Sequence, residues 1–358
     1  MTRRMTAFFA VAGLLAALLG LTAPAQADSA RQLKVTTYNI YQGAPLTPLL
    51  TAPTLPELIR RAGIAYDQMV ATDFPSRARA IAKLFRREKP EVVGLQEVAL
   101  WKKGPLTGSL TTTYDFLDIL LRELRAVGLH YRAAAIDTTF SATLPISATE
   151  RASFTDRDVI LTKDRLPVTH AQSHLYTARL VVTTPAGLTF TIPRGWSAVD
   201  VGLGHKPKAG PKTNDQSHTV RVATTHLEPT AASIRNAQGN ELHTALAQSP
   251  YPVIAVGDFN SLPTDATGPY GTFTSGGYDD AWRAVHGPGG GFTARQDPDL
   301  RNLPSKLDHR IDYVFYQPSR LSAVAAEVIG DRPNERTPNG LWPSDHAGLA
   351  VTLRLRQC

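Results

Sequence analysis

The sequence is almost free of cysteine, and it has no long apolar segment beyond its first residues. The single cysteine among 358 residues is Cys358, at the C-terminus, so no internal disulfide bond is expected. The apolar run at residues 8–21 is shorter than the roughly 20 residues that a membrane-spanning helix needs. No other segment has that character. Stability is therefore expected to come from a buried core, aided by any bound metal.

Sequence signatures of several other hydrolases are also missing. There is no H-E-x-x-H pair and no cysteine cluster, which disfavours a zinc site. There is no G-x-S-x-G turn, which disfavours a serine nucleophile. No internal repeat and no clear linker divides the chain. The length fits one large domain or two small ones.

The first 27 residues have the pattern of a secretory signal peptide. Arg3 and Arg4 form a positive start, an apolar run follows, and Ala25-Gln26-Ala27 is a small-residue cleavage site. We therefore expect residues 1–27 to be removed and the mature protein, residues 28–358, to be secreted or otherwise exported. A retained membrane anchor is the alternative. The mature chain would hold 358 − 27 = 331 residues, and we expect a monomer without a transmembrane segment.

The net charge is mildly basic. The full chain carries a formal charge of +7, and removal of Arg3 and Arg4 lowers it to +5. This balance is compatible with a nucleic acid or an anionic lipid surface as partner, but soluble exported enzymes often have it too. Charge alone therefore leaves the partner open.

Hydrophobic patterning indicates alternating strands and helices. Short, β-branched apolar runs between turn residues predict strands, and longer amphipathic runs predict helices. Such alternation is typical of an α/β layered domain. The expected strands are residues 33–41, 92–98, 158–162, 179–184, 188–192, 219–225, 253–257, 311–316 and 349–355, and the expected helices are residues 55–70, 77–87, 114–127 and 233–248.

Three stretches are expected to be loops because they are polar or rich in glycine and proline. The second of them carries three lysines that could reach the phosphates of a nucleic acid, although a solvated loop is the commoner role for such lysines. The loops are residues 141–155, 202–217 and 287–305, and the lysines are Lys206, Lys208 and Lys212.

Six short polar motifs lie at or near the ends of apolar runs. Carboxylates, amides and histidines in such places suit phosphate ester hydrolysis assisted by a hard divalent metal. If they form one site, nearly the whole mature chain must fold together, which favours a single domain over residues 28–358. The motifs are Tyr38-Asn39-Ile40, Gln96-Glu97-Val98, Thr225-His226-Leu227, Gly257-Asp258-Phe259-Asn260, Arg310-Ile311-Asp312-Tyr313 and Ser344-Asp345-His346.

Asp258 and Asn260 are candidates for handling water and phosphate. They follow a strand-like run, and residues two apart on an extended chain face the same way. A carboxylate beside an amide can hold a water and a phosphoryl oxygen together. Gly257 would permit a sharp exit from the strand. The alternative is an Asx turn without a catalytic role.

Glu97 and Asn39 are candidate metal-site residues. Glu97 closes the run at residues 92–96, and a carboxylate that ends a buried strand is costly unless it is paired or bound to metal. A few hard oxygen ligands that leave room for water and substrate suit Mg²⁺. Asn39 lies inside an apolar strand, needs hydrogen-bond partners and could support Glu97 or a metal-bound water. A surface glutamate and a structural asparagine are the alternatives.

His226 and His346 are candidates for proton transfer or phosphate binding. His226 ends an apolar run and could donate a proton to a leaving oxygen or bind a phosphoryl oxygen. Asp312 could orient His346, as an acid orients a catalytic base. A lone histidine on a buried strand is more often structural, so the argument depends on the joint pattern.

Taken in order, the six motifs resemble the endonuclease/exonuclease/phosphatase superfamily, and its deoxyribonuclease and sphingomyelinase members in particular. The resemblance covers most of the mature chain. It implies a four-layer α/β sandwich, in which two mixed β-sheets pack face to face with helices outside. It also implies a site at one edge of the sheets and phosphodiester hydrolysis by in-line attack of water on phosphorus.

The same resemblance implies a metal site. Glu97 resembles the main metal ligand, with Asn39 close by, and Asp345 resembles a neighbour on the metal side. Mg²⁺ is the expected cofactor, with another hard divalent cation such as Mn²⁺ or Ca²⁺ as the alternative. The number of metal ions is left open.

The implied catalytic residues are His226, Asp258, Asn260, Asp312 and His346. Asp258 and Asn260 resemble the pair that positions the attacking water and the phosphate. Asp312 and His346 resemble an Asp–His dyad, and either Asp258 or this dyad would act as base. His226 resembles the histidine of deoxyribonuclease and sphingomyelinase members, at a place where abasic-site enzymes usually have tyrosine. The abasic-site branch is therefore disfavoured.

Two substrate classes fit the sequence best. A nuclease is narrowly favoured because of the net positive charge and the three loop lysines. A sphingomyelinase-like phospholipid phosphodiesterase is the alternative, with Trp196 and Trp342 as candidate membrane-contacting aromatics, although buried tryptophans are commoner. A non-catalytic binding protein on the same fold would be expected to lack a motif residue, and none is missing. Residues 305–310 lack the pattern of inositol polyphosphate phosphatases.

Overall fold

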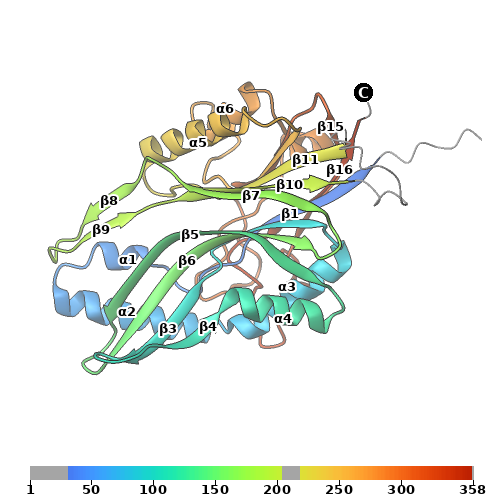
Figure 1. The fold of residues 1–358 in the computed structure, drawn as a ribbon. Helices are drawn as coiled ribbons and strands as arrows, with labels where there is room; N and C mark the ends of the chain where they lie inside the picture. The colour runs from blue at the N-terminus through green and yellow to red at the C-terminus, as the bar shows by residue number, and fades with distance from the viewer. Residues whose placement is uncertain (1–30, 204–217, 357–358) are drawn as a thin grey trace, which may run out of the picture. The chain divides into compact units, whose positions relative to one another are not determined.

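The computed structural model describes residues 31–203 and 218–356, and these form four layers (Figure 1). Two large β-sheets lie in the middle, and helices cover their outer faces. The expected four-layer α/β sandwich with two mixed sheets is confirmed. The predicted signal peptide at residues 1–27 lies outside the described residues. No described helix combines the length and the apolar character needed to cross a membrane.

The first sheet has the strand order β15-β16-β1-β2-β6-β3-β4, with β5 paired to β6. Its central strands β1 and β2 run parallel, and their neighbours β16 and β6 run antiparallel to them. The carboxyl ends of β1 and β2 therefore meet at one edge of the sheet. The strands are β1 (Gln32–Asn39), β2 (Val92–Gln96), β3 (Leu100–Pro105), β4 (Thr111–Asp115), β5 (Tyr131–Pro145), β6 (Glu150–Lys163), β15 (Leu321–Ile329) and β16 (Gly348–Leu355).

The second sheet has the order β13-β14-β12-β11-β10-β7, and again two central strands, β11 and β12, run parallel. The pair β8 and β9 forms a separate two-stranded hairpin, which Figure 1 shows on the left, above α1. The strands are β7 (Val168–Leu175), β8 (Leu180–Thr183), β9 (Thr189–Ile192), β10 (Gly195–Gly202), β11 (Thr219–His226), β12 (Val253–Asp258), β13 (Asp279–Asp280) and β14 (Asp312–Tyr316).

Several helices begin at a residue whose side chain caps them. The Thr54 hydroxyl accepts a hydrogen bond from the Glu57 amide at the start of α2, and the Asp115 carboxylate caps α4 in the same way. The larger helices pack on the sheets, while α7 lies against β14 and β15. The helices are α1 (Thr47–Leu50), α2 (Leu55–Ala71), α3 (Phe74–Glu88), α4 (Phe116–Ala126), α5 (Ala232–Leu246), α6 (Pro269–Ser275), α7 (Ala281–His286) and the 3₁₀ turn η2 (Pro333–Glu335).

Three apolar clusters hold the four layers together. The middle cluster joins the two sheets through residues such as Val35 and Val256, while two outer clusters join each sheet to its helices. Alternate residues of one strand serve different clusters: Ile254 faces the other sheet, and Ala255 faces α5 and α6. Since both faces are covered, the central strands appear as continuous apolar runs. The sheets approach closely at Gly94, where a Cβ would lie 2.5 Å from the Val256 side chain.

All nine predicted strands and all four predicted long helices are present, with shifted ends. The prediction of a loop at residues 141–155 is wrong, because β5 and β6 continue through it as an antiparallel ribbon. The serines and threonines of this ribbon alternate with Ala142, Leu144, Ala152 and Phe154. This alternation is typical of a strand, but the polar composition of the segment obscured it. Residues 287–305 are irregular as predicted. The loop predicted at residues 202–217, with its three lysines, falls mainly outside the described residues.

Candidate active site

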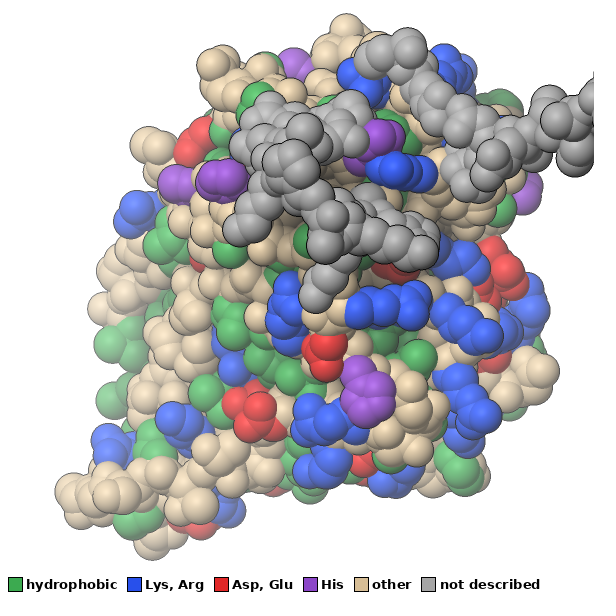
Figure 2. Space-filling view, turned by 45° about the vertical axis from the view of Figure 1, so that its right-hand side comes forward, with side chains coloured by type: hydrophobic (Ala, Val, Ile, Leu, Met, Phe, Trp, Pro, Cys, Tyr) green, Lys and Arg blue, Asp and Glu red, His purple; other side chains and the backbone are tan. Residues whose placement is uncertain are grey.

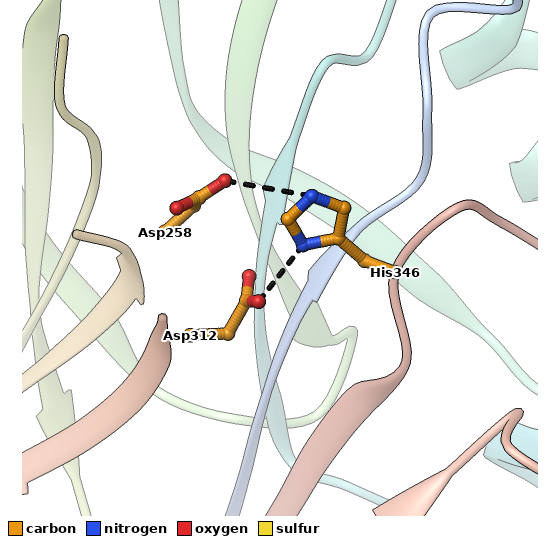
Figure 3. A group of neighbouring side chains, drawn as sticks. All are labelled: Asp258, Asp312 and His346. Carbon is orange, nitrogen blue, oxygen red and sulfur yellow. Dashed lines mark hydrogen bonds and ion pairs between the residues drawn. The ribbon is translucent and has the colours of Figure 1, made fainter. Parts of the chain in front are cut away.

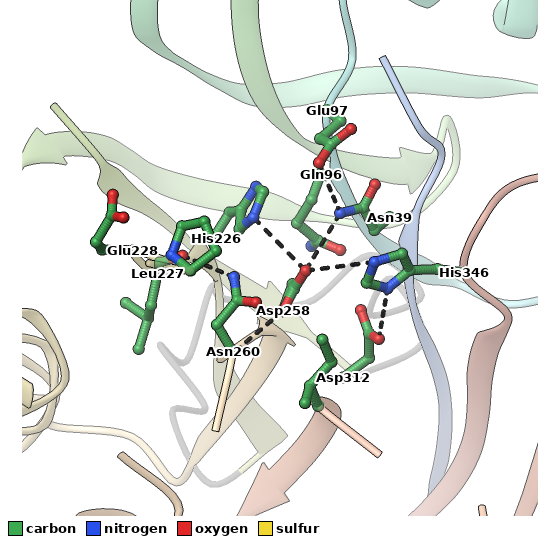
Figure 4. A network of polar contacts seen from close by, with 12 residues as sticks. Asn39, Gln96, Glu97, His226, Leu227, Glu228, Asp258, Asn260, Asp312 and His346 are labelled. Atoms are coloured by element: carbon green, nitrogen blue, oxygen red, sulfur yellow. Dashed lines mark hydrogen bonds and ion pairs between the residues drawn. The ribbon is translucent and has the colours of Figure 1, made fainter. Parts of the chain in front are cut away.

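The functional side chains gather where the parallel strands of both sheets end (Figure 4). Asn39 is the last residue of β1, and Glu97 directly follows β2. In the other sheet His226 and Asp258 are the last residues of β11 and β12 and lie opposite one another. Asp312, the first residue of the antiparallel β14, lies opposite Asp258. Strand direction and register thus bring five residues from distant parts of the chain to one edge.

Asp258 lies at the centre of this group. One carboxylate oxygen accepts a hydrogen bond from Asn39 Nδ2 at 3.2 Å, and it also lies 3.5 Å from His226 Nε2 and 3.8 Å from His346 Nε2. The other oxygen accepts from the Asn260 amide at 3.0 Å. Burial and the charge of Asp312 raise the pKa of Asp258 to about 7. The group is therefore poised to take up or release a proton near neutral pH.

Asp312 and His346 form the predicted dyad (Figure 3), with His346 Nδ1 at 2.8 Å from Asp312 Oδ2. Burial opposes protonation of His346, but the charge and hydrogen bond of Asp312, with the charges of Asp345 and Asp258, outweigh it. The pKa of His346 is therefore raised well above its usual value. Asp312 is fully buried and holds the imidazole in one orientation.

His226 is held by Arg194, a residue that precedes β10 and that no sequence motif singled out. Arg194 Nη1 lies 3.1 Å from His226 Nδ1 and 3.2 Å from Asp156 Oδ2. Because a guanidinium can only donate, His226 Nδ1 accepts, and the proton of a neutral ring sits on Nε2, facing Asp258. Burial, with the charges of Arg194 and His346, lowers the pKa of His226 well below its usual value. A neutral His226 suits a hydrogen-bond donor better than a general acid.

Asn39 joins the metal-site candidates to Asp258. Its Nδ2 donates to Glu97 Oε1 and to Asp258 Oδ2, both at 3.2 Å. Glu97 has a left-handed backbone with φ of 58°, which is unusual for a non-glycine residue, and its second oxygen accepts from the Gln42 amide at 2.8 Å. Burial and the charge of Asp345, among other acids, raise the pKa of Glu97 to about 7.

Asp345 is linked to the same edge through Ser344. The Ser344 hydroxyl lies 2.7 Å from the Asn39 carbonyl oxygen, to which it donates, and 3.3 Å from Asp345 Oδ1. Burial, opposed by the positive charges of His346 and Arg77, raises the pKa of Asp345. All eight site residues predicted from the sequence therefore lie in one region of the protein.

Arg77 is a second residue that the motifs did not reveal. It is fully buried beneath the site, and its guanidinium donates to the carbonyl oxygens of Ile40, Tyr41 and Pro343 at 2.7–3.1 Å. It thereby ties the loop after β1 to the loop that carries Asp345. An arginine inside an amphipathic helix gives no sign in the sequence that it points inward.

Three expectations need correction. Gly257 does not mark the exit from β12 but lies within it, where a Cβ would lie 2.2 Å from the Thr225 carbonyl oxygen. The chain turns at Asn260, whose φ is 49°, and whose side chain donates to the Leu227 carbonyl oxygen. Trp196 and Trp342, the candidate membrane-contacting aromatics, are both buried inside the protein.

A match to known proteins agrees with this geometry. The model of the endonuclease/exonuclease/phosphatase family matches residues 36–346, a span that contains every motif above. The chain belongs to this family. Phosphoric ester hydrolysis is the chemistry of its members, and they generally depend on divalent metal.

The individual relatives of this family member are distant. Nocturnin of Drosophila melanogaster is 31% identical over 168 residues, which cover 37% of this chain and 25% of that protein. This chain therefore matches only about a quarter of the length of that curated relative. An endonuclease/exonuclease/phosphatase of Beutenbergia cavernae is 25% identical, covers 91% of this chain and 72% of its own, and has a TM-score of 0.54. The truncated Caenorhabditis elegans TDP2 shares the fold at 17% identity, with coverage of 90% and 97% and a TM-score of 0.51.

The donors of this family member suit a hard divalent cation. Glu97 and Asp345 are partly buried carboxyl groups whose pKa is raised, so ionising both is unfavourable unless a cation neutralises them. Asp258, Asp312 and His346 also offer ligand atoms within 4.8 Å of one another. The described residues thus present two overlapping donor sets, one around Glu97 and one around His346.

A cleft of about 340 Å³ opens beside these residues. Glu97, Arg194, His226, Asp258 and His346 line one end of it. Most of the remaining lining is apolar and includes side chains from α1 and the preceding loop, from β5 and β6, and from the β8–β9 hairpin. The polar cluster is therefore accessible to a substrate through a largely apolar passage.

Proposed function

We propose that this protein is a divalent-metal-dependent phosphodiester hydrolase, in which water attacks phosphorus in line. The observation that carries the proposal is the position of Asp258, whose carboxylate lies within 4 Å of Asn39, His226 and His346 at the polar end of an open cleft. A carboxylate surrounded by two imidazoles and an amide can hold water beside a phosphoryl group. Family membership supports the reaction class.

In this mechanism Asp258 is the base. It is central among the three contacts described above, and the Asn260 amide and Asn39 side chain fix its two oxygens. His226 donates its Nε2 proton in a hydrogen bond to a phosphoryl oxygen. His346, oriented by Asp312, binds a second phosphoryl oxygen and stabilises the charge that develops in the transition state.

Glu97 and Asp345, with Asn39 close by, would hold the metal, for which Mg²⁺ is the first choice and Mn²⁺ or Ca²⁺ the alternative. Bound there, a divalent cation would supply neutralisation of negative charge on the phosphate and the leaving oxygen. The chain itself orients the Glu97 carboxylate through Asn39 and the Gln42 amide, and it places the Asp345 carboxylate beside the Ser344 hydroxyl.

Export and a monomeric state belong to the same proposal, and they rest on the sequence of residues 1–27 and on the single catalytic domain expected over residues 28–358. Nucleic acid is one substrate class to test. Its support is the net positive charge of the chain. On the face seen in Figure 2, however, lysine and arginine side chains are interspersed with acidic ones.

The test uses a diester without sequence or chain-length bias. Residues 28–358 are incubated with bis(4-nitrophenyl) phosphate in Mg²⁺ and in EDTA, and release of nitrophenol is followed. We expect hydrolysis in Mg²⁺, loss in EDTA, and a loss of about a thousandfold in His346→Ala. The exposed helical variant Asp67→Asn is the matched control and should behave like the parent. Hydrolysis that persists in EDTA or in His346→Ala would reject the proposal.

A further inference from the structure

The cleft is polar at one end only, and this difference points to a substrate class. We propose that the substrate is an amphiphilic phosphodiester, with its phosphate at Asp258 and a hydrocarbon chain along the apolar part of the cleft. This inference rests on the proposed function. The apolar wall is defined here as Leu46, Phe140, Leu144, Leu180, Phe190 and Ile192, all of which line the cleft.

The ribbon of β5 and β6 supplies one side of the cleft. Phe140, Ala142 and Leu144 are spaced two apart along β5, so their side chains share one face of the strand. Ala152 and Phe154 of β6 add to that face, since Ala142 pairs with Phe154 and Leu144 with Ala152. All five line the cleft. A continuous strip of hydrocarbon and aromatic surface results.

The β8–β9 hairpin supplies another side. Phe190 and Ile192 are two apart on β9, and Ile192 lies opposite Leu180 of β8. All three line the cleft and are only partly buried, so their apolar surface is open to an occupant. Leu46, just before α1, also lines the cleft and is partly buried. Such surface gains stability when a ligand removes it from water.

The charges of the cleft disfavour a nucleic acid strand along this wall. Among the described residues that line it, Arg194 is the single lysine or arginine, and it is already paired with Asp156. Glu97, Glu228 and Asp345 line the cleft as well. A polynucleotide carries a phosphate at every step and needs several cations along its path. An amphiphile carries a single phosphate, and its hydrocarbon chain would lie along the uncharged part of the cleft.

The expected effect follows from the burial of methylene groups. A cleft of about 340 Å³ holds part of a single chain. Each methylene that enters it should tighten binding about fourfold until the wall ends. Because this slope compares homologues that share one head group, it is independent of how the head group binds.

The experiment uses alkylphosphocholines, which are phosphodiesters with one chain, in lengths of six, eight and ten carbons and below their micellar concentrations. Binding to residues 28–358 is measured by calorimetry in EDTA and in Mg²⁺, and hydrolysis is measured in Mg²⁺. Alkyl glucosides of equal chain length control for chain binding without phosphate. The dinucleotide TpT and bis(4-nitrophenyl) phosphate are run beside them.

Two neighbouring substitutions on β9 give a matched pair. Phe190→Asn places a polar group in the apolar wall and should flatten the chain-length series. Thr191→Asn changes the exposed opposite face of the same strand and should keep the full slope. Because each slope is a ratio within one variant, partial loss of active protein cancels.

A steep series that Phe190→Asn flattens supports the inference. Hydrolysis of the small diester with a flat series overturns it and leaves the proposed function standing. So does a preference for TpT over the ten-carbon amphiphile. A steep binding series without hydrolysis of any diester supports the chain-binding cleft and rejects the proposed function.

Discussion

The two ends of the cleft are built in different ways. The polar end is made by buried residues at the ends of central strands, held by the hydrogen bond from Asn39 to Asp258 and by the one between His346 and Asp312. The apolar wall is made by partly exposed side chains on β5, on the β8–β9 hairpin and beside α1. Residues that need a fixed geometry for catalysis thus lie in the core of the fold. The side chains proposed to bind a flexible hydrocarbon chain lie at its periphery.

This difference has an energetic side. Burial raises the pKa of Glu97 and Asp258 to about 7, so the polar end is unfavourable for folding when those groups are ionised. The apolar wall leaves hydrocarbon in contact with water but buries no charge. Substitutions at the polar end should therefore change turnover and stability strongly, and substitutions in the wall should change selectivity.

The largest expected effect is at the polar end, with Glu97→Ala. We expect turnover to fall by about a thousandfold, because a carboxylate that orients the metal and the phosphate is lost. The folded state should persist, as seen by circular dichroism.

In the apolar wall, Leu144→Asn should lower kcat/KM about tenfold for the ten-carbon alkylphosphocholine and less for the shorter ones. Equal losses in the two variants on all substrates would erase the distinction between the two ends.

The scaffold beneath the polar end is tested by Arg77→Met. The change leaves four buried carbonyl oxygens, those of Ile40, Tyr41, Thr72 and Pro343, without their donor, so the free energy of unfolding should fall by about 3 kcal/mol or more. Arg60→Met, on the exposed face of α2, is the control and should cost less than about 0.5 kcal/mol. Urea unfolding measures both. Similar midpoints would mean that Arg77 does not hold the two loops together.

The charge conflict at the polar end predicts how stability depends on pH. The raised pKa values mean that the folded protein keeps protons that the unfolded chain releases above about pH 4. Through these two carboxylates, stability of the metal-free protein should fall as the pH rises from about 4 to about 7, and the raised pKa of His346 should extend the fall above pH 7. Mg²⁺ should raise the melting temperature at pH 8 and have little effect at pH 5.

Glu97→Gln isolates the cause of this dependence. It should weaken both the pH dependence and the response to Mg²⁺, whereas Asp67→Asn should keep them. Differential scanning calorimetry with and without EDTA makes the measurement. A response to Mg²⁺ that is as strong at pH 5 as at pH 8, or that survives in Glu97→Gln, would argue against these carboxylates as the metal site.

An effect much smaller than that of Glu97→Ala is expected at Arg194, at the polar end of the cleft. Arg194→Met removes the donor to His226 Nδ1 and frees the ring to change tautomer, so turnover should fall about tenfold. Arg194→Lys keeps a donor and should recover part of the loss. Nitrogen NMR of His226 should show an unprotonated Nδ1 in the parent and a mixture in Arg194→Met. An unchanged tautomer would leave Arg194 with a structural role.

Much of this protein could be predicted from the sequence. The six motifs gave the family, the layered fold and eight residues that the structure brings to one region. The prediction succeeded because such features are encoded in short stretches of sequence. Apolar runs mark buried strands, and polar residues at their ends mark an edge of the sheet.

Other features depended on contacts that no local pattern encodes. In the sequence, Arg77 and Arg194 resemble ordinary surface cations. Only the folded structure shows that Arg77 donates to a backbone carbonyl oxygen beneath the site and that Arg194 contacts His226. The ribbon at residues 141–155 looked like a loop because its exposed face is polar. Trp196 and Trp342 were buried by neighbours far away in the sequence.

The sequence by itself determined which side chains could do the chemistry, because residue type and strand ends are local properties. Only the tertiary structure decided what lies beside them. The apolar wall draws Leu46, Phe140 and Phe190 from three separate segments, and each is unremarkable where it stands in the chain. Substrate preference follows from that assembly, since a cleft exists only when distant segments meet.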